Sequence, residues 1–399
     1  MWRHTFTIPK TISTLKIRKD HIREGLYGSV IALLFLSLPL ILSCEGPAAS
    51  VKNENLLSDS LATIPAIELY RQMEQISASY IMVGHQDALA YGMGWRGAEF
   101  KSDIHDVCGD FPTVYGWDLG HIDDLYNIDS VPFADMIRWA KEVHKRGGIN
   151  TYSWHILNLV TGGSSWDSSE CVSSILPGGK YHEDFMKKLD RAAAFFNRLR
   201  DQDSLLIPVL FRPWHEMNGG WFWWGSESCT PEEYKQLWRF TTDYLRNEHK
   251  LNNLIYIYST DVFENSEEYL TYYPGDAYVD ILGYDDYKGL YDRSTTYRTI
   301  EMLEILSDIA REKTKLYTIS EGGVETIPDS TWFSQVVLPA LTSNGKTRGI
   351  SYILFWRNGR PDHFYAPYPG HASAEDFIEF MKDSSIVLLE ELQQILNKK

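Results

Sequence analysis

Two glutamates in this sequence have neighbours that suit acid–base chemistry on a sugar. Glu216 lies in the segment Arg212 to Trp224, which also carries histidine, asparagine and four tryptophans. Glu321 lies much later, in the run Ser320-Glu321-Gly322-Gly323. Two opposed carboxyl groups are what cleavage of a glycosidic bond requires, because one protonates the leaving oxygen and the other attacks the anomeric carbon or activates water. Indole faces suit the flat C–H surfaces of pyranose rings.

An acid for this reaction must keep its proton near neutral pH. Indole walls would exclude water from Glu216, and a nearby Glu321 carboxylate would repel a second negative charge. Both effects raise the pKa of a carboxyl group. A single glutamate at the end of a strand is more often a solvated surface residue, so the hypothesis depends on the two glutamates meeting.

Motifs for other chemistries are incomplete. His215-Glu216 begins the zinc pattern HExxH, but the second histidine is missing. The run 92–97 matches GxGxxG by its letters, but it carries bulky Trp and Arg that are unsuited to a phosphate-binding turn. The sequence has no GxxxxGK[ST] loop and no GxSxG elbow. We expect neither a metal nor an organic cofactor.

The composition indicates a large folded protein in which some aromatic rings face a ligand. The sequence has 38 Lys+Arg against 54 Asp+Glu and a net charge of −16, which argues against nucleic-acid binding because phosphate contacts need clustered bases. Hydrophobic residues make up 44% of the chain, enough for a large core. Aromatic residues reach 14%, with 13 Trp and 24 Tyr, so we expect some rings to face a ligand.

Strand-like and helix-like segments alternate along the chain. The predicted strands are Tyr80 to Gly84, Pro112 to Gly116, Gly148 to Tyr152, Leu206 to Phe211, Leu254 to Tyr258, Val279 to Gly283, Leu316 to Ser320 and Gly349 to Phe355. Helical periodicity marks Phe133 to Lys145, Phe185 to Arg200, Glu232 to Asn247 and Thr299 to Glu312. Such alternation gives parallel strands with crossover helices. Eight units predict an α/β fold of the (β/α)8 TIM-barrel type with a single catalytic domain, and an open doubly wound sheet is the alternative.

Residues able to do chemistry cluster directly after the predicted strands. In a barrel, the βα loops form the active face, and the ends of the fourth and seventh strands lie across the mouth from each other. Glu216 and Glu321 can therefore meet. The clustered residues are His85, Asp87, Trp117, Asp118, Trp154, His155, His215, Glu216, Asp261, Asp285, Tyr287, Glu321, Trp356 and Arg357.

Several motifs resemble glycoside hydrolase family 26. They are the run Arg212 to Gly219 with Trp221 to Trp224, then Gly283 to Tyr287, Ser320-Glu321 and Phe355 to Arg357. The resemblance extends over about residues 65 to 395. It implies a (β/α)8 barrel that acts with retention on β-1,4-mannan, with Glu216 as the acid/base and Glu321 as the nucleophile.

The resemblance also implies the surroundings of the reacting sugar. Tyr287 would hydrogen-bond the nucleophile, and Trp221 would flank the leaving-group side. The residues expected to line the subsite of the mannosyl unit are His155, His215 and Trp356. The further residues expected to bind substrate are Asp285, Arg357, His85 and Trp117.

The expected function is that of a retaining β-1,4-mannanase acting on mannan, galactomannan or glucomannan. Endo action and release of mannobiose both remain open, because loops 162–179 and 91–96 could close one end of the cleft. Other activities open to the family are hydrolysis of β-1,3-1,4-glucan or β-1,3-xylan. A non-catalytic glycan-binding lipoprotein and a structural envelope lipoprotein are alternatives of other classes. We expect a monomer whose partner is a β-mannan polysaccharide or manno-oligosaccharide.

The amino-terminal segment resembles the signal peptide of a bacterial lipoprotein. Basic residues precede the apolar run Val30 to Leu42, which is too short to span a bilayer comfortably. The run ends at Ile41-Leu42-Ser43-Cys44, which resembles a lipobox. A membrane-anchoring helix is the alternative, but Pro39 interrupts the run.

These features predict a division into three parts. Residues 1–43 would be a signal peptide, residues 44–63 a lipidated Cys44 and flexible tether, and residues 64–399 the catalytic domain. We expect an exported protein that a lipid on Cys44 anchors to the bacterial cell envelope. The remaining cysteines, Cys108, Cys171 and Cys229, permit at most one intramolecular disulfide.

Overall fold

The computed structural model describes residues 56–397. The expected signal peptide, the expected lipidated Cys44 and most of the expected tether lie outside these residues. Within residues 56–397, none of the helices has the length and apolar character needed to cross a bilayer. Cys108, Cys171 and Cys229 are all free thiols.

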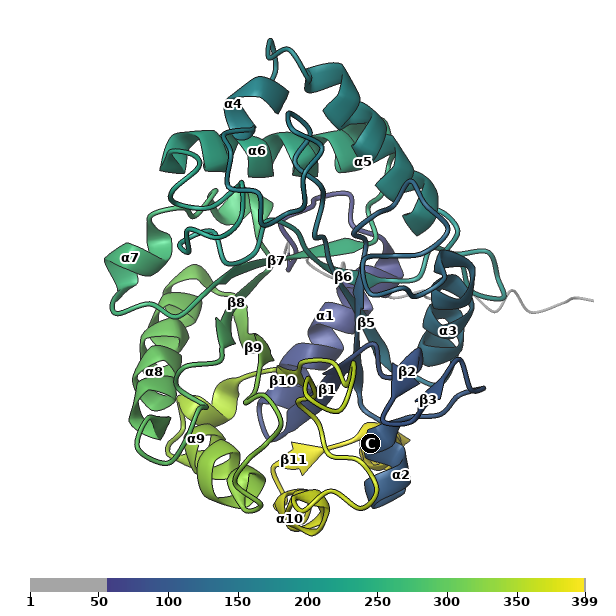
Figure 1. Ribbon diagram of the computed structural model, residues 1–399, viewed down its shortest axis with the longest axis vertical. Coiled ribbons are helices and arrows are strands. Elements are labelled where there is room, and N and C mark those ends of the chain that lie inside the picture. Colours follow the sequence, from purple (N-terminus) through teal and green to yellow (C-terminus); the bar gives the residue numbers. More distant parts are fainter. Residues whose placement is uncertain (1–55, 398–399) are drawn as a thin grey trace, which may run out of the picture. The chain divides into compact units, whose positions relative to one another are not determined.

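Eight parallel strands form a closed barrel (Figure 1). Each strand pairs with the next along the chain, and β10 pairs with β1 to close the ring. All eight predicted strands are confirmed, although β6 and β10 begin three residues later than expected. The strands of the ring are β1 (Ile81–Gln86), β4 (Val114–Asp118), β5 (Ile149–Ser153), β6 (Val209–Arg212), β7 (Leu254–Thr260), β8 (Ile281–Asp286), β9 (Leu316–Gly322) and β10 (Tyr352–Phe355).

Helices surround the ring, as the alternating pattern predicts (Figure 1). The four predicted helices are confirmed as α3 (Phe133–Lys145), α5 (His182–Phe196), α6 (Pro231–Asp243) and α8 (Thr296–Lys313). The π-helical turn η1 (Tyr244–Glu248) continues α6. The shorter helices are α2 (Asp103–Cys108), α4 (Val172–Ile175), α7 (Ser266–Leu270), η2 (Asp276–Tyr278), η3 (Phe333–Val337), α9 (Leu338–Thr342), η4 (Thr347–Gly349), α10 (Ala374–Phe380) and α11 (Leu389–Asn397).

Two small β elements stand beside the ring. The antiparallel pair β2 (Tyr91–Gly92) and β3 (Trp95–Arg96) forms a hairpin after β1. The short strand β11 (Ile386–Val387) pairs with β1 from outside the ring.

The helix α1 (Ile64–Ser77) closes the amino-terminal end of the barrel. Its Tyr70 and Met73 pack in one apolar cluster with inward-facing strand residues such as Ile255 and Ile257. The neighbouring residue Tyr256 belongs to a second cluster, between the strands and the outer helices. Because side chains alternate along a strand, one strand supplies both clusters. The loops that follow the strands lie at the opposite end of the barrel.

The segment before α1 corrects the expected tether. Leu57 is buried in the cluster that closes the barrel. The Ser58 backbone N–H donates to Asp280 Oδ1 at 2.6 Å, and Arg246 donates to Ser58 Oγ at 2.6 Å. Asp59 accepts a hydrogen bond from Asn252 at 2.8 Å. The expected boundary at residue 64 is therefore wrong. Residues 57–63 belong to the folded domain, where the polar side chains of Ser58 and Asp59 hydrogen-bond Arg246 of η1 and Asn252 before β7.

Candidate active site

The loop after β6 holds Glu216 in an unusual backbone conformation. Both Trp214 and Glu216 have a φ of +54°, in the left-handed region that non-glycine residues seldom adopt. The Glu216 N–H donates to the Ser259 carbonyl on β7 at 2.9 Å. Strained residues of this kind persist where their surroundings fix them, and they gather at functional sites.

Three of the four tryptophans around Glu216 serve to hold this loop. They are fully buried, and each indole N–H donates to a fixed acceptor. The pairs are Trp214 with Thr241 Oγ1 at 3.1 Å, Trp223 with the Ile156 carbonyl at 3.0 Å, and Trp224 with the His215 carbonyl at 2.8 Å. Only the fourth tryptophan, Trp221, is available to a ligand.

Glu321 lies on β9, with both carboxylate oxygens bound. The Tyr287 hydroxyl donates to Oε1 at 2.6 Å, and the Arg212 guanidinium donates to Oε2. The other arm of Arg212 donates to Asp285 Oδ2 at 2.7 Å. The Ser320 hydroxyl also donates to Asp285. A network of hydrogen bonds and ion pairs therefore holds Glu321 inside the barrel mouth.

The barrel brings the two glutamates together. One oxygen from each of Glu216, Asp285 and Glu321 lies within 4.8 Å of the other two. Such a trio could in principle ligate a cation. Here the Arg212 guanidinium already binds two of the three carboxylates and supplies positive charge between them.

Burial and the close approach of the three carboxyl groups shift the pKa values of Glu216 and Asp285. Burial, followed by the charges of Asp285 and Glu321, raises the pKa of Glu216 well above its usual range. Burial also raises the pKa of Asp285, to about 7, against the opposing effect of Arg212. Glu216 is therefore suited to carry a proton at neutral pH, as an acid must.

One wall of the cleft is built from His155, His215 and Trp356. The His155 Nδ1 lies 2.7 Å from Asp118 Oδ2. Burial disfavours charge on His155, but the Asp118 carboxylate outweighs it and raises the pKa of the ring. Burial, followed by Arg212, lowers the pKa of His215 well below its usual value. The pKa values of the two rings, whose centroids are 4.7 Å apart, are therefore shifted in opposite directions.

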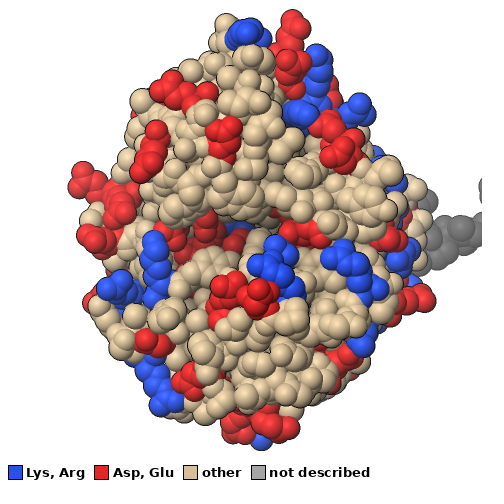
Figure 2. All heavy atoms as spheres, viewed as in Figure 1, with Lys and Arg blue, Asp and Glu red and all other residues tan. Residues whose placement is uncertain are grey.

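Trp221 lies on the acid's side of the cleft. Its indole N–H donates to Glu216 Oε2 at 2.8 Å. The ring is 37% exposed, so a face remains free for a ligand. The cleft that Trp221, Tyr287 and the two glutamates line has a volume of about 530 Å³, within the range of ligand sites. Figure 2 shows acidic side chains in the hollow of this face.

Two expected residues lie outside the cleft. Trp117 is fully buried between β4 and α3, where it stacks on Trp139 with ring centroids 6.1 Å apart. His85 is buried beside Asp103 of α2, and burial lowers the pKa of His85 to about 4. The expected pocket positions of Trp117 and His85 are therefore wrong, because each side chain takes the side of its strand that faces the outer helices.

Two others act at the edge of the site or beneath it. Arg357 pairs with Asp129 at 3.2 Å, next to the cleft, and does not line it. Asp285 lies beneath the reacting pair, where it is fully buried and bound to Arg212.

The sequence analysis missed several residues that line the cleft. Trp166 stacks on His155 with ring centroids 5.1 Å apart, and Phe222 packs against the same histidine. Phe222 lies in the motif Trp221 to Trp224, so its place near the cleft could have been predicted from the sequence. The others lie in loops of no regular pattern, which carry Trp166, Tyr291, Val324, Glu325 and Tyr365.

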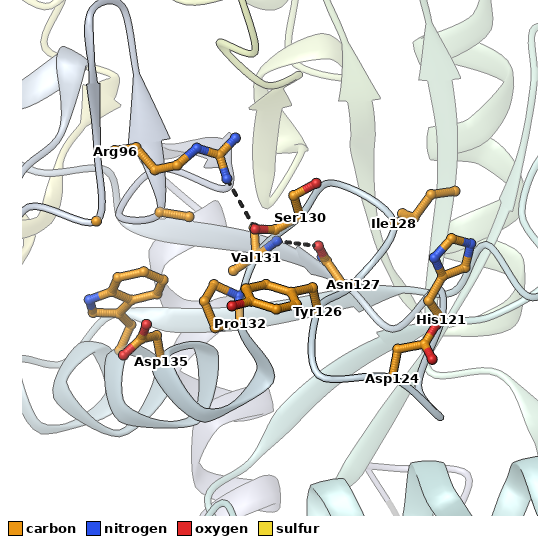
Figure 3. A pocket seen from close by; sticks show the side chains of 13 residues that line it. Arg96, His121, Asp124, Tyr126, Asn127, Ile128, Ser130, Val131, Pro132 and Asp135 are labelled. Atoms are coloured by element: carbon orange, nitrogen blue, oxygen red, sulfur yellow. Dashed lines mark hydrogen bonds between the residues drawn. The ribbon is translucent and has the colours of Figure 1, made fainter.

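A larger hollow of about 760 Å³ lies apart from this site (Figure 3). It borders the loop between β4 and α3, where Arg96 donates to the Ser130 carbonyl at 3.0 Å. Tyr126 lines it, and neither catalytic glutamate does. Size therefore does not identify the active site of this protein.

Solved structures resemble this barrel along most of its length. A GH26 β-mannanase from Bacteroides ovatus superposes with a TM-score of 0.79 at 40% identity, covering 82% of this chain and 96% of that chain. A modular endo-β-1,4-mannanase from Cellulomonas fimi gives a TM-score of 0.79 at 32% identity, covering 84% of this chain and 78% of that one.

A curated relative and a family model agree with these structures. A mannan endo-1,4-β-mannosidase of Bifidobacterium adolescentis is 33% identical over 366 residues, which cover 85% of this chain and only 36% of that protein. This chain thus spans about a third of that relative. Residues 58–331 match the family model described as Glycosyl hydrolase family 26. With its barrel, its facing glutamates and this match over more than half of its length, the chain belongs to glycosyl hydrolase family 26.

Proposed function

We propose that this protein is a retaining β-1,4-mannanase that cleaves mannan by double displacement. The observation that carries the proposal is the approach of the Glu216 and Glu321 carboxylate oxygens to within 4.8 Å. Retaining enzymes place their carboxyl groups about 5 to 5.5 Å apart, whereas inverting enzymes leave roughly 6.5 to 9.5 Å for a water. The short separation supports direct attack on the sugar.

In the first step, Glu321 attacks C1 of a β-mannosyl unit while Glu216 gives its proton to the departing oxygen. The C1–O bond breaks, an ester bond to Glu321 forms, and the shortened chain leaves as an alcohol. In the second step, ionised Glu216 takes a proton from water, which attacks C1 and releases Glu321. Two inversions at C1 give net retention.

The contacts of the two glutamates support this division of roles. Tyr287 and Arg212 both donate to Glu321, and bonds to the charged form favour a carboxylate that can attack. Glu216 has one donor, from Trp221, and burial together with neighbouring negative charges raises its pKa. Glu216 is thus suited to donate a proton, while two donors hold Glu321 in position to attack.

The substrate class is supported by the relatives and by the walls of the cleft. The relatives from Bifidobacterium, Bacteroides and Cellulomonas are described as mannan-degrading enzymes. Exposed rings such as Trp166 and Trp221 offer stacking faces to an uncharged polysaccharide. The proposed substrate is linear mannan, galactomannan or glucomannan, and the proposed action is either endo cleavage or release of mannobiose.

We also propose that the protein is exported and anchored to the cell envelope by a lipid on Cys44. The support is the sequence alone, namely the basic residues, the short apolar run and the lipobox-like Ile41-Leu42-Ser43-Cys44. Metabolic labelling with a clickable fatty acid should mark the wild type, and Cys44→Ala should abolish the label. Equal labelling of both proteins would contradict the anchor.

The roles of the two glutamates can be tested with aryl β-mannobiosides. Glu216→Ala should lose activity on mannan but still form the glycosyl enzyme from a dinitrophenyl mannobioside, whose leaving group needs no proton. Glu321→Ala should lose both activities. Added azide should yield a product of retained configuration with Glu216→Ala and of inverted configuration with Glu321→Ala.

Glu142→Ala, at a partly exposed position of α3 outside the cleft, serves as the control for preparation and assay. Equal residual activity of Glu216→Ala and Glu321→Ala on both substrates would contradict the assigned roles. A wild-type protein that releases no reducing ends from any β-mannan would refute the proposed function.

A further inference from the structure

A second hollow of about 670 Å³ adjoins the catalytic cleft and shares Trp221 with it. The loops after β6, β7 and β8, together with the start of α8, form its walls, so it opens at the same end of the barrel as the catalytic pair. Its lining includes Asn218, Asp261, Lys288 and Tyr297. None of these four residues lines the cleft of Glu216 and Glu321.

Trp221 stands as a partition between the two hollows. On one side its N–H donates to Glu216 Oε2. On the other side the Lys288 ammonium lies 5.9 Å from the centre of the ring. A Cβ on Gly219 would lie 2.3 Å from the ring, so the indole packs directly on the backbone of that glycine. Packing against the Gly219 backbone therefore fixes the orientation of the Trp221 indole.

The position of the second hollow decides which part of a substrate could enter it. Glu216 protonates the oxygen of the departing chain, so that chain leaves on the acid's side. The charge of Asp261, in the wall of the second hollow, acts directly on Glu216. His155 and Trp356, by contrast, line only the catalytic cleft. The second hollow thus continues the cleft past the acid.

The floor of this hollow is polar and rigid. Asn218 bridges two loops, because its Oδ1 accepts from the Asp261 N–H at 2.8 Å and its Nδ2 donates to the Val262 carbonyl at 3.0 Å. Lys288 donates to Asp261 Oδ2 at 2.7 Å while more than half of its side chain stays exposed. The Lys288 ammonium and the Asp261 carboxylate are therefore available as a fixed donor and a fixed acceptor for the hydroxyl groups of a ligand.

The outer rim carries an aromatic ring. Tyr297, at the start of α8, is 52% exposed. The Arg298 Nε donates to its hydroxyl at 3.3 Å, which limits the movement of the ring. The charged side chains of the lining are mostly acidic, namely Asp261, Glu264, Glu268 and Glu301 against Lys288 and Arg298. This balance disfavours an anionic glycan and suits an uncharged one.

We propose that this hollow binds the leaving-group end of an uncharged hexose polymer, with the Lys288–Asp261 pair bonding sugar hydroxyls and Tyr297 stacking on the outermost bound unit. The inference rests on the proposed mannanase function and extends the path of the chain beyond Trp221. Pockets that combine a flat ring with a few fixed polar groups are typical sugar sites.

The test compares Tyr297→Ala with the wild type on two substrates. Mannohexaose can reach the hollow, whereas an aryl mannobioside has a leaving group too short to do so. We expect kcat/KM on mannohexaose to fall about three- to tenfold, the loss of one aromatic contact. On the aryl mannobioside kcat/KM should not change. The preferred bond of mannohexaose labelled at its reducing end should also shift.

Tyr126→Ala is the matched control, since Tyr126 is equally 52% exposed but lies in the separate hollow of Figure 3. It should leave both substrates unaffected. Equal kcat/KM of Tyr297→Ala and wild type on mannohexaose would overturn the inference. So would a loss seen on branched galactomannan alone, which would assign the hollow to a side branch. A wild type inactive on both substrates would instead refute the proposed function.

Discussion

The hydrogen bond from Trp221 to Glu216 makes the pH profile of this protein predictable. The indole N–H is the donor that favours the ionised form of Glu216, so Trp221→Phe keeps an aromatic ring but removes that bond. The pKa of Glu216 should rise, and the proton should be lost only at higher pH. The alkaline limb of kcat/KM, which reports the acid of the free enzyme, should move upward.

The magnitude follows from the strength of the bond. A hydrogen bond to a charged group contributes about 1.5 to 3 kcal/mol. Each pKa unit corresponds to about 1.4 kcal/mol, so complete loss would move the limb by roughly 1 to 2 pH units. Trp221 is 37% exposed, and water can partly replace the donor. We therefore expect a shift of about 1 unit.

The assay is kcat/KM on mannotetraose between pH 4 and pH 10, from the release of reducing ends. The variant Asp261→Asn provides a control of opposite sign, because it removes a negative charge that raises the pKa of Glu216. Its limb should move downward. A dinitrophenyl mannobioside, which needs no proton, should follow neither shift. An unmoved limb in Trp221→Phe, or shifts of the same sign in both variants, would refute the reasoning.

Two further predictions concern the buried charges. The Asp118 pKa is about 2 instead of 3.8, because the His155 charge and hydrogen bonds outweigh burial, so this carboxylate contributes about 2 kcal/mol of stability above pH 4 that is lost as the pH falls toward 2. Asp118→Asn should therefore lower the free energy of unfolding in urea by about that amount at pH 7, and the two proteins should converge near pH 2; a constant difference would contradict the linkage. Arg212→Met should cost about 3 to 5 kcal/mol in the same assay, since it leaves Asp285 and Glu321 buried without their cation. The exposed pair Arg138–Asp135 offers the control Arg138→Met, which should change stability little, and equal losses in the two variants would refute this estimate.

The barrel could be predicted from the sequence because the alternation of strand and helix patterns repeats along the chain. Eight short runs alternate with helical periods, and errors of one to three residues at the strand ends leave the topology unchanged. The meeting of Glu216 and Glu321 then follows from the closed ring alone. Chain order and handedness fix it, so no side-chain detail was needed.

The direction of individual side chains could not be predicted in the same way. Trp117 and His85 stand at the right strand ends, but a shift of one residue turns a side chain from the cleft to the outer helices. Trp166 and Tyr365 enter the cleft from loops whose path depends on tertiary contacts. The wall of the cleft therefore combines predicted residues at strand ends with unpredicted residues from loops.

The packed segment 57–63 fixes the point at which the chain enters the barrel. Ser58 binds Asp280 just before β8, and Asp59 binds Asn252 just before β7, so the chain joins the domain at the end opposite the catalytic mouth. Deletion of residues 57–63 would thus remove contacts at the closed base of the barrel and none at its open end.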